Sequence, residues 1–284
     1  MKYDLTPTDD GSYTFFSPDF GEAYHSRSGA REEAEKKFVK SCQVAKIASE
    51  NQSISILDIC YGLGYNTAAA LAEIEKVNPR CHIKLIALEL DQNVGNLALE
   101  NGLLRVWGSS INDCLKRLVT GECINSPYLE AQLLLGDARQ TIQVVEATRW
   151  QADVIFLDPF SPTKCPQLWS VEFLTTVARC LKSEGYLATY SCAASVRWAL
   201  QLARLCIGRS ESVGRRSPGT LGRHINTGLQ PLSLQETEHL LTRAAIPYRD
   251  PSLKDDAETI IKRRQQEQDS SDLEITSHWR RRWR

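Results

Sequence analysis

Acidic residues follow four apolar runs of the sequence, where an unbound charge is costly. The runs cover residues 53–57, 83–88, 132–135 and 154–157, and the acids that follow them are Asp58, Glu89, Asp137 and Asp158. A carboxylate taken out of water costs several kcal/mol unless a partner satisfies it. We therefore expect these runs to be strands whose ends border a ligand site.

A glycine-containing turn follows the first run, with Asp58 before Gly62 and Gly64. Glycines let the backbone approach a ligand closely, and a following helix offers free N–H groups. A carboxylate at this point disfavours a pyrophosphate and suits a cationic ligand end, such as the amino-acid part of S-adenosylmethionine. Thr67 also replaces the third glycine of a dinucleotide fingerprint. The alternative is a tight strand-to-helix turn that binds nothing.

The next two acids suit the rest of such a cofactor. Glu89, preferred to Asp91, can accept both ribose hydroxyls, and Asp137 can accept a hydrogen bond from an adenine amino group. The alternative for Asp91 and Asp137 is helix capping. The predicted cofactor residues are Asp58, Tyr61, Gly62, Gly64, Asn66, Glu89, Asp137, Ala138 and Asp158.

The fourth acid opens a rigid loop, Asp158-Pro159-Phe160-Ser161-Pro162. Pro159 fixes the turn because its ring restricts the backbone. The loop resembles the Asp-Pro-Pro-aromatic loop of methyltransferases that act on amino groups, in which a carboxylate orients the amine and an aromatic ring supports the base. A purely structural turn is the alternative.

The surrounding elements predict an α/β fold. Apolar runs of strand length alternate with segments of helical periodicity, including a helix over residues 29–48, which is typical of a doubly wound, mostly parallel sheet covered by helices. Asp-Gly followed by alternating aromatic residues within 9–18 predicts an N-terminal hairpin. The chain turns charged after Pro251, which indicates a polar helix or flexible tail.

Composition excludes several protein classes. The 284 residues carry 34 Lys and Arg against 35 Asp and Glu, so no global charge indicates a nucleic-acid binder. Nine cysteines without a C-x-x-C pair argue against a zinc ribbon and a disulfide scaffold. No metal site is expected. Without a secretory signal or an apolar run near the ~18–20 residues of a membrane span, we expect a cytoplasmic protein with no membrane contact.

Several stretches together resemble the MnmC-like methyltransferases, which complete the 5-methylaminomethyl group on the wobble uridine of certain tRNAs. They are residues 14–26, 29–33, 62–66, 158–162 and 166–169, within a resembling region of roughly 12–225. Cys60 stands where the family turn usually has its first glycine, and the tail after Pro251 matches nothing in the family.

The resemblance implies a seven-stranded Rossmann-like methyltransferase sheet. Its predicted parts are an N-terminal hairpin and helix (1–48), an S-adenosylmethionine-dependent methyltransferase domain (49–250) and a charged helical or flexible tail (251–284). It also implies a stand-alone methyltransferase without an oxidase domain. The partners are tRNA and an upstream enzyme, such as an oxidase, that forms the aminomethyl group.

The implied reaction is N-methylation of the aminomethyl group of uridine 34, giving 5-methylaminomethyl-(2-thio)uridine. Asp158 would hold the amine beside Phe160, while Tyr24 and His25 close the site. The alternatives are a small-molecule amine methyltransferase, such as a polyamine enzyme, and a non-catalytic cofactor- or RNA-binding module. A dehydrogenase is disfavoured by Asp58 and Thr67.

A local excess of arginine predicts the RNA contact. Residues 197–223 hold six arginines against one acid, Glu211, and clustered arginine suits a phosphate backbone. Arg215, Arg216 and Arg223 are the predicted RNA-binding residues, with a solvated helix face as the alternative for the cluster. Trp and Arg alternate at 279–284 and offer a second, weaker candidate.

Overall fold

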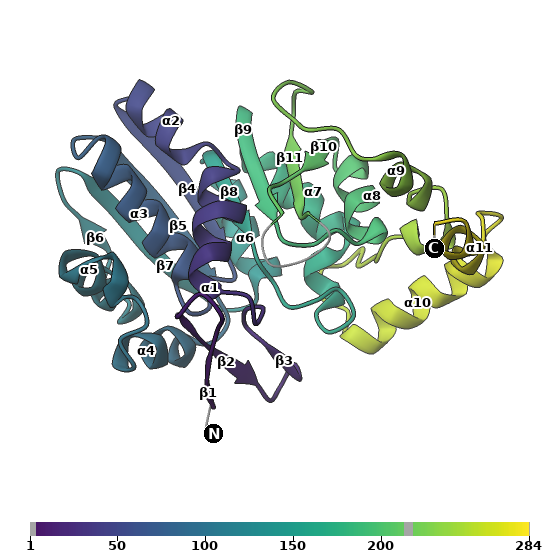
Figure 1. The fold of residues 1–284 in the computed structure, drawn as a ribbon, viewed down its shortest axis with the longest axis horizontal. Helices are drawn as coiled ribbons and strands as arrows, with labels where there is room; N and C mark the ends of the chain where they lie inside the picture. The colour runs from purple at the N-terminus through teal and green to yellow at the C-terminus, as the bar shows by residue number, and fades with distance from the viewer. Residues whose placement is uncertain (1–3, 213–217, 284) are drawn as a thin grey trace.

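An eight-stranded, mostly parallel sheet forms the centre of the computed structural model, which describes residues 4–212 and 218–283 (Figure 1). Across the sheet the strands run in the order β10, β11, β9, β8, β4, β5, β7, β6. Their bounds are β4 Ser53–Ile59, β5 His82–Glu89, β6 Ile124–Asn125, β7 Leu129–Leu135, β8 Ala152–Leu157, β9 Leu181–Thr189, β10 Cys206–Arg209 and β11 Thr220–Arg223. The predicted doubly wound α/β fold is confirmed, although the described sheet has one strand more than the seven expected.

Pairing within the sheet places the ligand edge. The inner strands β9, β8, β4, β5 and β7 pair in parallel, whereas β6, β10 and β11 join antiparallel at the edges. The chain winds outward from β4 through β5 and β7, then returns to β8 and β9. The order therefore reverses between β4 and β8, where open α/β sheets bind ligands at their carboxyl ends.

Helices cover both faces because the inner strands are apolar on both sides. On β4, Ile54 and Ile56 pack with one layer of helices, while Leu57 and Ile59 pack with the other. The first layer contains η1 Glu33–Lys40, α2 Val44–Glu50, α3 Tyr65–Val77, α4 Gln92–Glu100, η2 Arg105–Trp107 and α5 Ser109–Val119. The second contains α6 Ala138–Ala147, η3 Pro166–Trp169, α7 Val171–Arg179, α8 Ala194–Leu202 and α10 Ala257–Ser270.

The single helix predicted over residues 29–48 is wrong in detail. A short turn, α1 Ala30–Glu32, leads into the π-helix η1, and α2 begins after Gln43, which adopts a left-handed backbone with φ 56°. Helical periodicity indicates an apolar face and does not reveal such interruptions. Extended π-helical geometry is rare and frequently accompanies functional sites.

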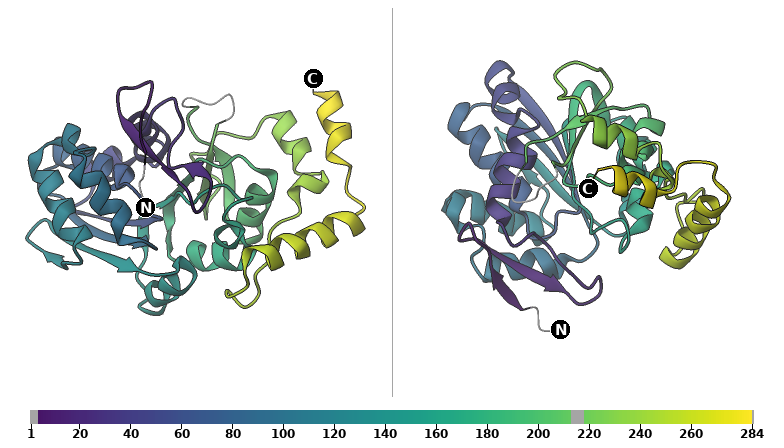
Figure 2. Two further views of the ribbon diagram at one scale, coloured as in Figure 1. Left: turned by 90° about the horizontal axis from the view of Figure 1, so that it is seen from below. Right: turned by 45° about the vertical axis from the view of Figure 1, so that its right-hand side comes forward.

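The predicted N-terminal hairpin is confirmed. β1 Leu5–Pro7 pairs antiparallel with β2 Tyr13–Ser17, and β3 Glu22–Ala23 adds a third short strand. Figures 1 and 2 show this unit projecting beside α1, away from the C-terminal helices.

The C-terminal part is helical. α9 Leu234–His239, η4 Arg243–Ala245, α10 and α11 Thr276–Arg282 lie together at one end of the molecule (Figure 2). Ile260 is the one buried residue of α10, so polar contacts dominate, such as Arg264 Nε donating to the carbonyl of Ile246 at 2.6 Å. Within residues 4–212 and 218–283, no helix is long and apolar enough to cross a membrane.

Candidate active site

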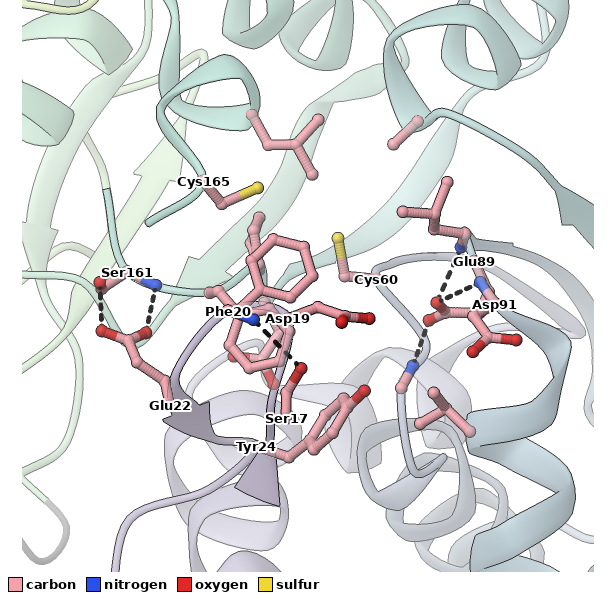
Figure 3. Close-up of a pocket in the computed structure, with 18 of the residues that line it drawn as sticks. Ser17, Asp19, Phe20, Glu22, Tyr24, Cys60, Glu89, Asp91, Ser161 and Cys165 are labelled. Atoms are coloured by element: carbon pink, nitrogen blue, oxygen red, sulfur yellow. Dashed lines mark hydrogen bonds between the residues drawn. The ribbon is translucent and has the colours of Figure 1, made fainter. Parts of the chain in front are cut away.

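A cavity of about 640 Å³ opens at the carboxyl ends of β4, β5, β7 and β8. Its walls come from three parts of the chain: residues 16–26 with Glu33, the strand ends, and the loop after β8. Figure 3 shows Ser17, Glu22 and Tyr24 from the first part in the lower half of the view, and Glu89 and Asp91 at its right. The cavity falls in the usual size range of small-molecule sites.

The turn after β4 uses left-handed backbone at Cys60, Gly62 and Gly64, with φ 67°, 54° and 83°. A side chain on Gly64 would collide with the hydroxyl of Tyr61, which packs beneath the turn. Cys60 accepts a conformation that costs non-glycine residues roughly 1–2 kcal/mol, and its thiol borders the cavity opposite Cys165 (Figure 3). The turn therefore keeps its glycine-like shape despite the cysteine.

Asp58 lies behind this turn and not on the cavity wall. It is fully buried, and Thr67 Oγ1 donates to its Oδ2 at 2.5 Å. Burial raises the pKa of Asp58 to about 7, and the charge of Glu89 adds to the effect. Thr67, at the position of the missing third glycine, thus joins α3 to the end of β4.

Glu89 stands on the wall and ties the strand ends together. Its carboxylate accepts hydrogen bonds from the backbone N–H groups of Gly62 (2.7 Å), Leu90 (2.7 Å) and Asp91 (3.0 Å). Burial raises the pKa of Glu89, against the opposing effect of these donors. These three backbone donors fix the orientation of the carboxylate at the wall, and its contact with the ribose hydroxyls stays a prediction.

Asp91 and Asp137 both act as helix caps, the alternative noted from the sequence. Asp91 accepts from Asn93 N and begins α4; Asp137 accepts from Arg139 N and begins α6, each at 2.9 Å. Arg139 also pairs with Asp137 and with the buried Asp250, both at 2.7 Å. Asp137 still lines the cavity with Ala138, so its contact with adenine stays a prediction.

Asp158 ends β8 and faces the cavity. Asn66 Nδ2 donates to its Oδ2 at 2.9 Å, and Asn66 itself is not among the residues that line the cavity. Burial raises the pKa of Asp158 to about 8, and the next largest contribution is the negative charge of Glu33. A carboxyl with such a pKa exists in both protonation states near neutral pH.

Aromatic rings surround Phe160. Phe20 stacks on it with centroids 4.3 Å apart, and Tyr24 lies tilted at 5.0 Å. The loop backbone is held by Trp169 Nε1, which donates to the Phe160 carbonyl at 2.8 Å, and by Tyr190, which donates to the Pro159 carbonyl at 2.9 Å. One face of Phe160 is therefore already covered by Phe20.

His25 lies beside this group with its ring against Tyr65, the centroids 4.9 Å apart. Its Nδ1 and Thr14 Oγ1 are 3.2 Å apart. Burial lowers the pKa of His25 to about 4, so the ring is neutral at physiological pH.

The hairpin is fastened to the loop by Glu22. Its carboxylate accepts from Ser161 N at 3.0 Å and from Ser161 Oγ at 2.5 Å (Figure 3). Phe20, Glu22 and Glu33 have no local sequence pattern that indicates a role, although all three belong to segments that carry the family resemblance.

Of the four described arginines in the cluster, Arg197 and Arg223 are buried, Arg209 is half-buried and Arg204 is exposed. Arg223 donates to the carbonyls of Glu184 (2.7 Å) and Gly185 (3.3 Å) and lies over the Tyr186 ring at 4.0 Å. This buried position contradicts the predicted RNA contact of Arg223, because its guanidinium is already used inside the protein. Arg197 is also buried, paired with Glu236 at 3.0 Å. Arg215 and Arg216 lie outside the described residues.

The terminal Trp and Arg side chains contact α9. Trp279 stacks on His239 with centroids 4.0 Å apart, and Arg282 pairs with Glu238 at 3.0 Å and Glu274 at 2.6 Å. Arg280 and Arg281 are exposed.

The predicted site residues divide into two sets. All four predicted catalytic residues line the cavity: Asp158, Phe160, Tyr24 and His25. Of the predicted cofactor residues, Gly62, Glu89, Asp137, Ala138 and Asp158 line it, whereas Asp58, Tyr61, Gly64 and Asn66 are absent from its wall.

The charge of the wall fits the expected cofactor. Its described residues include seven acids and no lysine or arginine, and its one histidine is neutral at physiological pH. A pyrophosphate would be repelled, while a sulfonium and an ammonium would be favoured. These residues therefore suit S-adenosylmethionine and not a dinucleotide.

Three comparisons place the chain among known proteins. Residues 101–225 match a family model described as S-adenosyl-L-methionine-dependent methyltransferase. An uncharacterized protein of Methanocaldococcus jannaschii is 31% identical over 92% of this chain and 71% of its own length. The bifunctional MnmC protein of Aromatoleum aromaticum, named for tRNA 5-methylaminomethyl-2-thiouridine biosynthesis, is 28% identical over 80% of this chain, which spans 36% of that protein.

The crystal structure of MnmC2 from Aquifex aeolicus superposes with a TM-score of 0.83 and 30% identity, covering 95% of this chain and 86% of that one. Sequence, fold and cavity agree: the chain belongs to the MnmC-like family of S-adenosylmethionine-dependent methyltransferases.

Proposed function

We propose that the protein transfers a methyl group from S-adenosylmethionine to the aminomethyl group of uridine 34 in tRNA. The product is 5-methylaminomethyl-(2-thio)uridine. The observation that carries this proposal is the position of Asp158 beside the Phe20–Phe160–Tyr24 cluster, in a cavity whose wall has no lysine or arginine among its described residues. A carboxylate next to aromatic rings suits a cationic amine attached to a flat base.

Gly62, Glu89, Asp137 and Ala138 would hold the cofactor. When bound, it supplies an electrophilic methyl group on a positively charged sulfur. Glu89 is already oriented by three backbone donors, so a ribose hydroxyl meets a fixed acceptor. Asp158 and its loop, with the aromatic rings around Phe160, form the part of the wall that we assign to the methyl acceptor.

Asp158 has to prepare the amine. An alkylamine has a pKa near ~10, so most of it arrives as an ammonium ion. The carboxylate binds that cation, orients it, and stabilises the charge that returns to nitrogen once the methyl is transferred. Orientation alone is worth effective molarities of ~10⁵ M or more in well-aligned systems.

Recognition of the tRNA is assigned to Arg215 and Arg216, together with the aromatic cluster. The names of the bifunctional relatives support tRNA as the substrate. This chain spans 36% of the Aromatoleum aromaticum protein. The proposed reaction needs an aminomethyl group that an earlier enzymatic step has already formed on the uridine.

The direct test uses the purified full chain, methyl-labelled S-adenosylmethionine, and tRNA with either 5-aminomethyluridine or unmodified uridine at position 34. Nucleoside mass spectrometry should find label in 5-methylaminomethyluridine with the first tRNA and none with the second. Labelling of a free polyamine in preference to the tRNA would replace this proposal with a small-molecule reaction.

A further inference from the structure

A buried ion pair stands at the acceptor side of the cavity. Lys37 Nζ donates to Glu33 Oε1 at 2.6 Å, and the two side chains are 1% and 8% exposed. Lysine and glutamate are almost never buried unless paired, and a buried pair commonly gains no stability over apolar residues. A contribution to folding stability therefore does not explain why a Lys37–Glu33 pair is buried here.

The location of Glu33 points to the reaction instead. Glu33 lines the same cavity as Asp158 and begins the π-helix η1, while Lys37 lies one turn further on and away from the wall. Ser26 Oγ lies 3.4 Å from the other carboxylate oxygen of Glu33. The pair thus presents a carboxylate to the cavity, with its counter-ion placed behind it.

The groups that face Asp158 come from three elements. η1 contributes Glu33 and Lys37, β4 contributes Asp58, and α3 contributes the amide of Asn66. Among the charges, Glu33 has the largest effect and raises the pKa of Asp158, which Lys37 lowers by less. Glu33 also acts on His25, whose ring burial keeps neutral at physiological pH.

We propose that Glu33, paired with Lys37, is a positioning residue that acts through Asp158 and makes it the base that deprotonates the substrate ammonium. This inference rests on the proposed function, because it needs an amine as the methyl acceptor. It assigns a purpose to the buried lysine: the counter-ion keeps Glu33 charged in a site that would otherwise favour the protonated form.

The proton transfer and the methyl transfer balance as two steps. First, the ammonium gives one proton to the Asp158 carboxylate, leaving a neutral amine and a carboxylic acid. Then the nitrogen lone pair forms a bond to the methyl carbon, and the carbon–sulfur bond breaks with its electron pair remaining on sulfur. The nitrogen becomes a secondary ammonium, and Asp158 releases its proton to water.

Base strength is the reason for such tuning. An ordinary aspartate near ~4 is a poor base for an ammonium near ~10, since the transfer is unfavourable by about six orders of magnitude. A carboxyl pKa of about 8 reduces that gap to about two. Efficient acid–base catalysis needs a pKa close to the working pH.

The test compares two neighbouring pairs of the same segment. Glu33→Gln removes the buried charge, and Glu32→Gln, the matched control, removes the exposed Lys36–Glu32 pair. With 5-aminomethyluridine tRNA, the acid limb of the kcat/KM pH profile should move down by about one pH unit in Glu33→Gln. The rate at its plateau should fall several-fold to about tenfold, and Glu32→Gln should behave as wild type.

A second measurement needs no tRNA. Carbon NMR of protein with labelled aspartate carboxyls should show the Asp158 signal, identified by its loss in Asp158→Asn, titrating near pH 8. In the Glu33→Gln protein, the Asp158 carboxyl should titrate at a lower pH than in the wild type. If Glu33→Gln fails to fold, Glu33→Gln with Lys37→Met removes both charges and should show a smaller downward shift, because Lys37 lowers the pKa of Asp158 by less than Glu33 raises it.

These measurements distinguish failure of this inference from failure of the proposed function. An unmoved Asp158 titration, or an unmoved acid limb, in a folded Glu33 variant would overturn this inference. Wild-type protein that shows the Asp158 shift but does not methylate the tRNA would overturn the proposed function, while the coupling between Glu33 and Asp158 would stand.

Discussion

The part of the cavity wall that we assign to the cofactor and the part that we assign to the methyl acceptor are built in different ways. The cofactor side consists of consecutive strand ends, and Glu89 is held there by backbone donors of its own strand end and of the neighbouring turn. The acceptor side joins residues 16–33 to the loop at 158–168 through side chains, chiefly Glu22 with Ser161 and Phe20 with Phe160.

Because of this difference, substitutions in the two parts of the wall should affect different properties of the enzyme. Sheet register fixes the cofactor side, so a substitution there should weaken cofactor binding and leave the loop intact. The acceptor side depends on a few contacts between distant segments, and sites need such supporting contacts to hold their geometry. Variants on the two sides should therefore separate cofactor affinity from turnover.

The largest effect is expected on the acceptor side. Asp158→Asn keeps the size of the side chain but removes the charge that binds and deprotonates the amine, so kcat should fall by about 10²-fold or more. Affinity for S-adenosylmethionine, measured by calorimetry near pH 7, should fall by a few-fold at most, because Asp158 is only partly ionised there and its attraction for the sulfonium is correspondingly weak. Near wild-type turnover at saturating tRNA would remove Asp158 from the mechanism, and an equal loss of cofactor affinity would move it to the cofactor side.

The sequence was sufficient for the parts that depend on local pattern. Apolar runs predicted strands that correspond to β4, β5, β7 and β8, and the acids after these runs marked the edge of the sheet that carries the cavity. The antiparallel edge strands and α5 were not predicted, since short edge strands carry little apolar signal.

Long-range contacts could not be read in this way. Nothing near Glu22 in the sequence indicates Ser161, and nothing near Arg223 indicates Tyr186 or the carbonyls it meets. Charge was a poor guide for the same reason: the excess of arginine in 197–223 suggested a surface, while Arg197 and Arg223 are used in the interior. Glu33 had a signal, its place in a segment of family resemblance, but no local pattern showed its role.

On the cofactor side, Glu89→Ala should weaken S-adenosylmethionine binding by about 1–3 kcal/mol, the usual cost of unsatisfied polar partners. The loss includes the three backbone N–H groups that Glu89 now satisfies. The kcat at saturating cofactor should stay within a few-fold of wild type. Asp91→Asn is the control, because asparagine caps α4 as aspartate does, and it should bind the cofactor normally.

Calorimetry with NAD offers a check on the same side. The acidic wall should exclude it, so NAD binding as tight as that of S-adenosylmethionine would contradict the assignment of this cavity.

A smaller effect should follow from releasing the hairpin. Glu22→Gln weakens the double contact with Ser161, so the KM for tRNA should rise several-fold while cofactor affinity is unchanged. Ser161→Ala removes the hydroxyl but leaves the backbone donor, and its effect should be smaller. If both variants change cofactor affinity instead, the hairpin supports the cofactor side and the division drawn here is wrong.

The smallest effects should come from the titration of the buried acids, which links pH first to the stability of the unliganded protein. Burial raises the pKa of Asp58 to about 7 and that of Asp158 to about 8. Raised carboxyl pKa values contribute stability that is complete below the unfolded value near ~4 and is lost as pH rises through the folded values. Unliganded protein should therefore melt at a lower temperature at pH 8.5 than at pH 6, and Asp158→Asn should reduce that difference.

Binding of a cation should lower the pKa values of Asp58 and Asp158, because a positive sulfur near these acids favours their ionised forms. Protons should be released on binding, and affinity for S-adenosylmethionine should rise from pH 6 to pH 8, by less than the about tenfold per pH unit of one full proton. S-adenosylhomocysteine, which lacks the sulfonium charge, should release fewer protons. Calorimetry in two buffers of different ionisation enthalpy measures the difference directly. Equal proton release by both ligands would mean that the sulfur does not lie near Asp158, and the acceptor side would then have to be sought elsewhere on the wall.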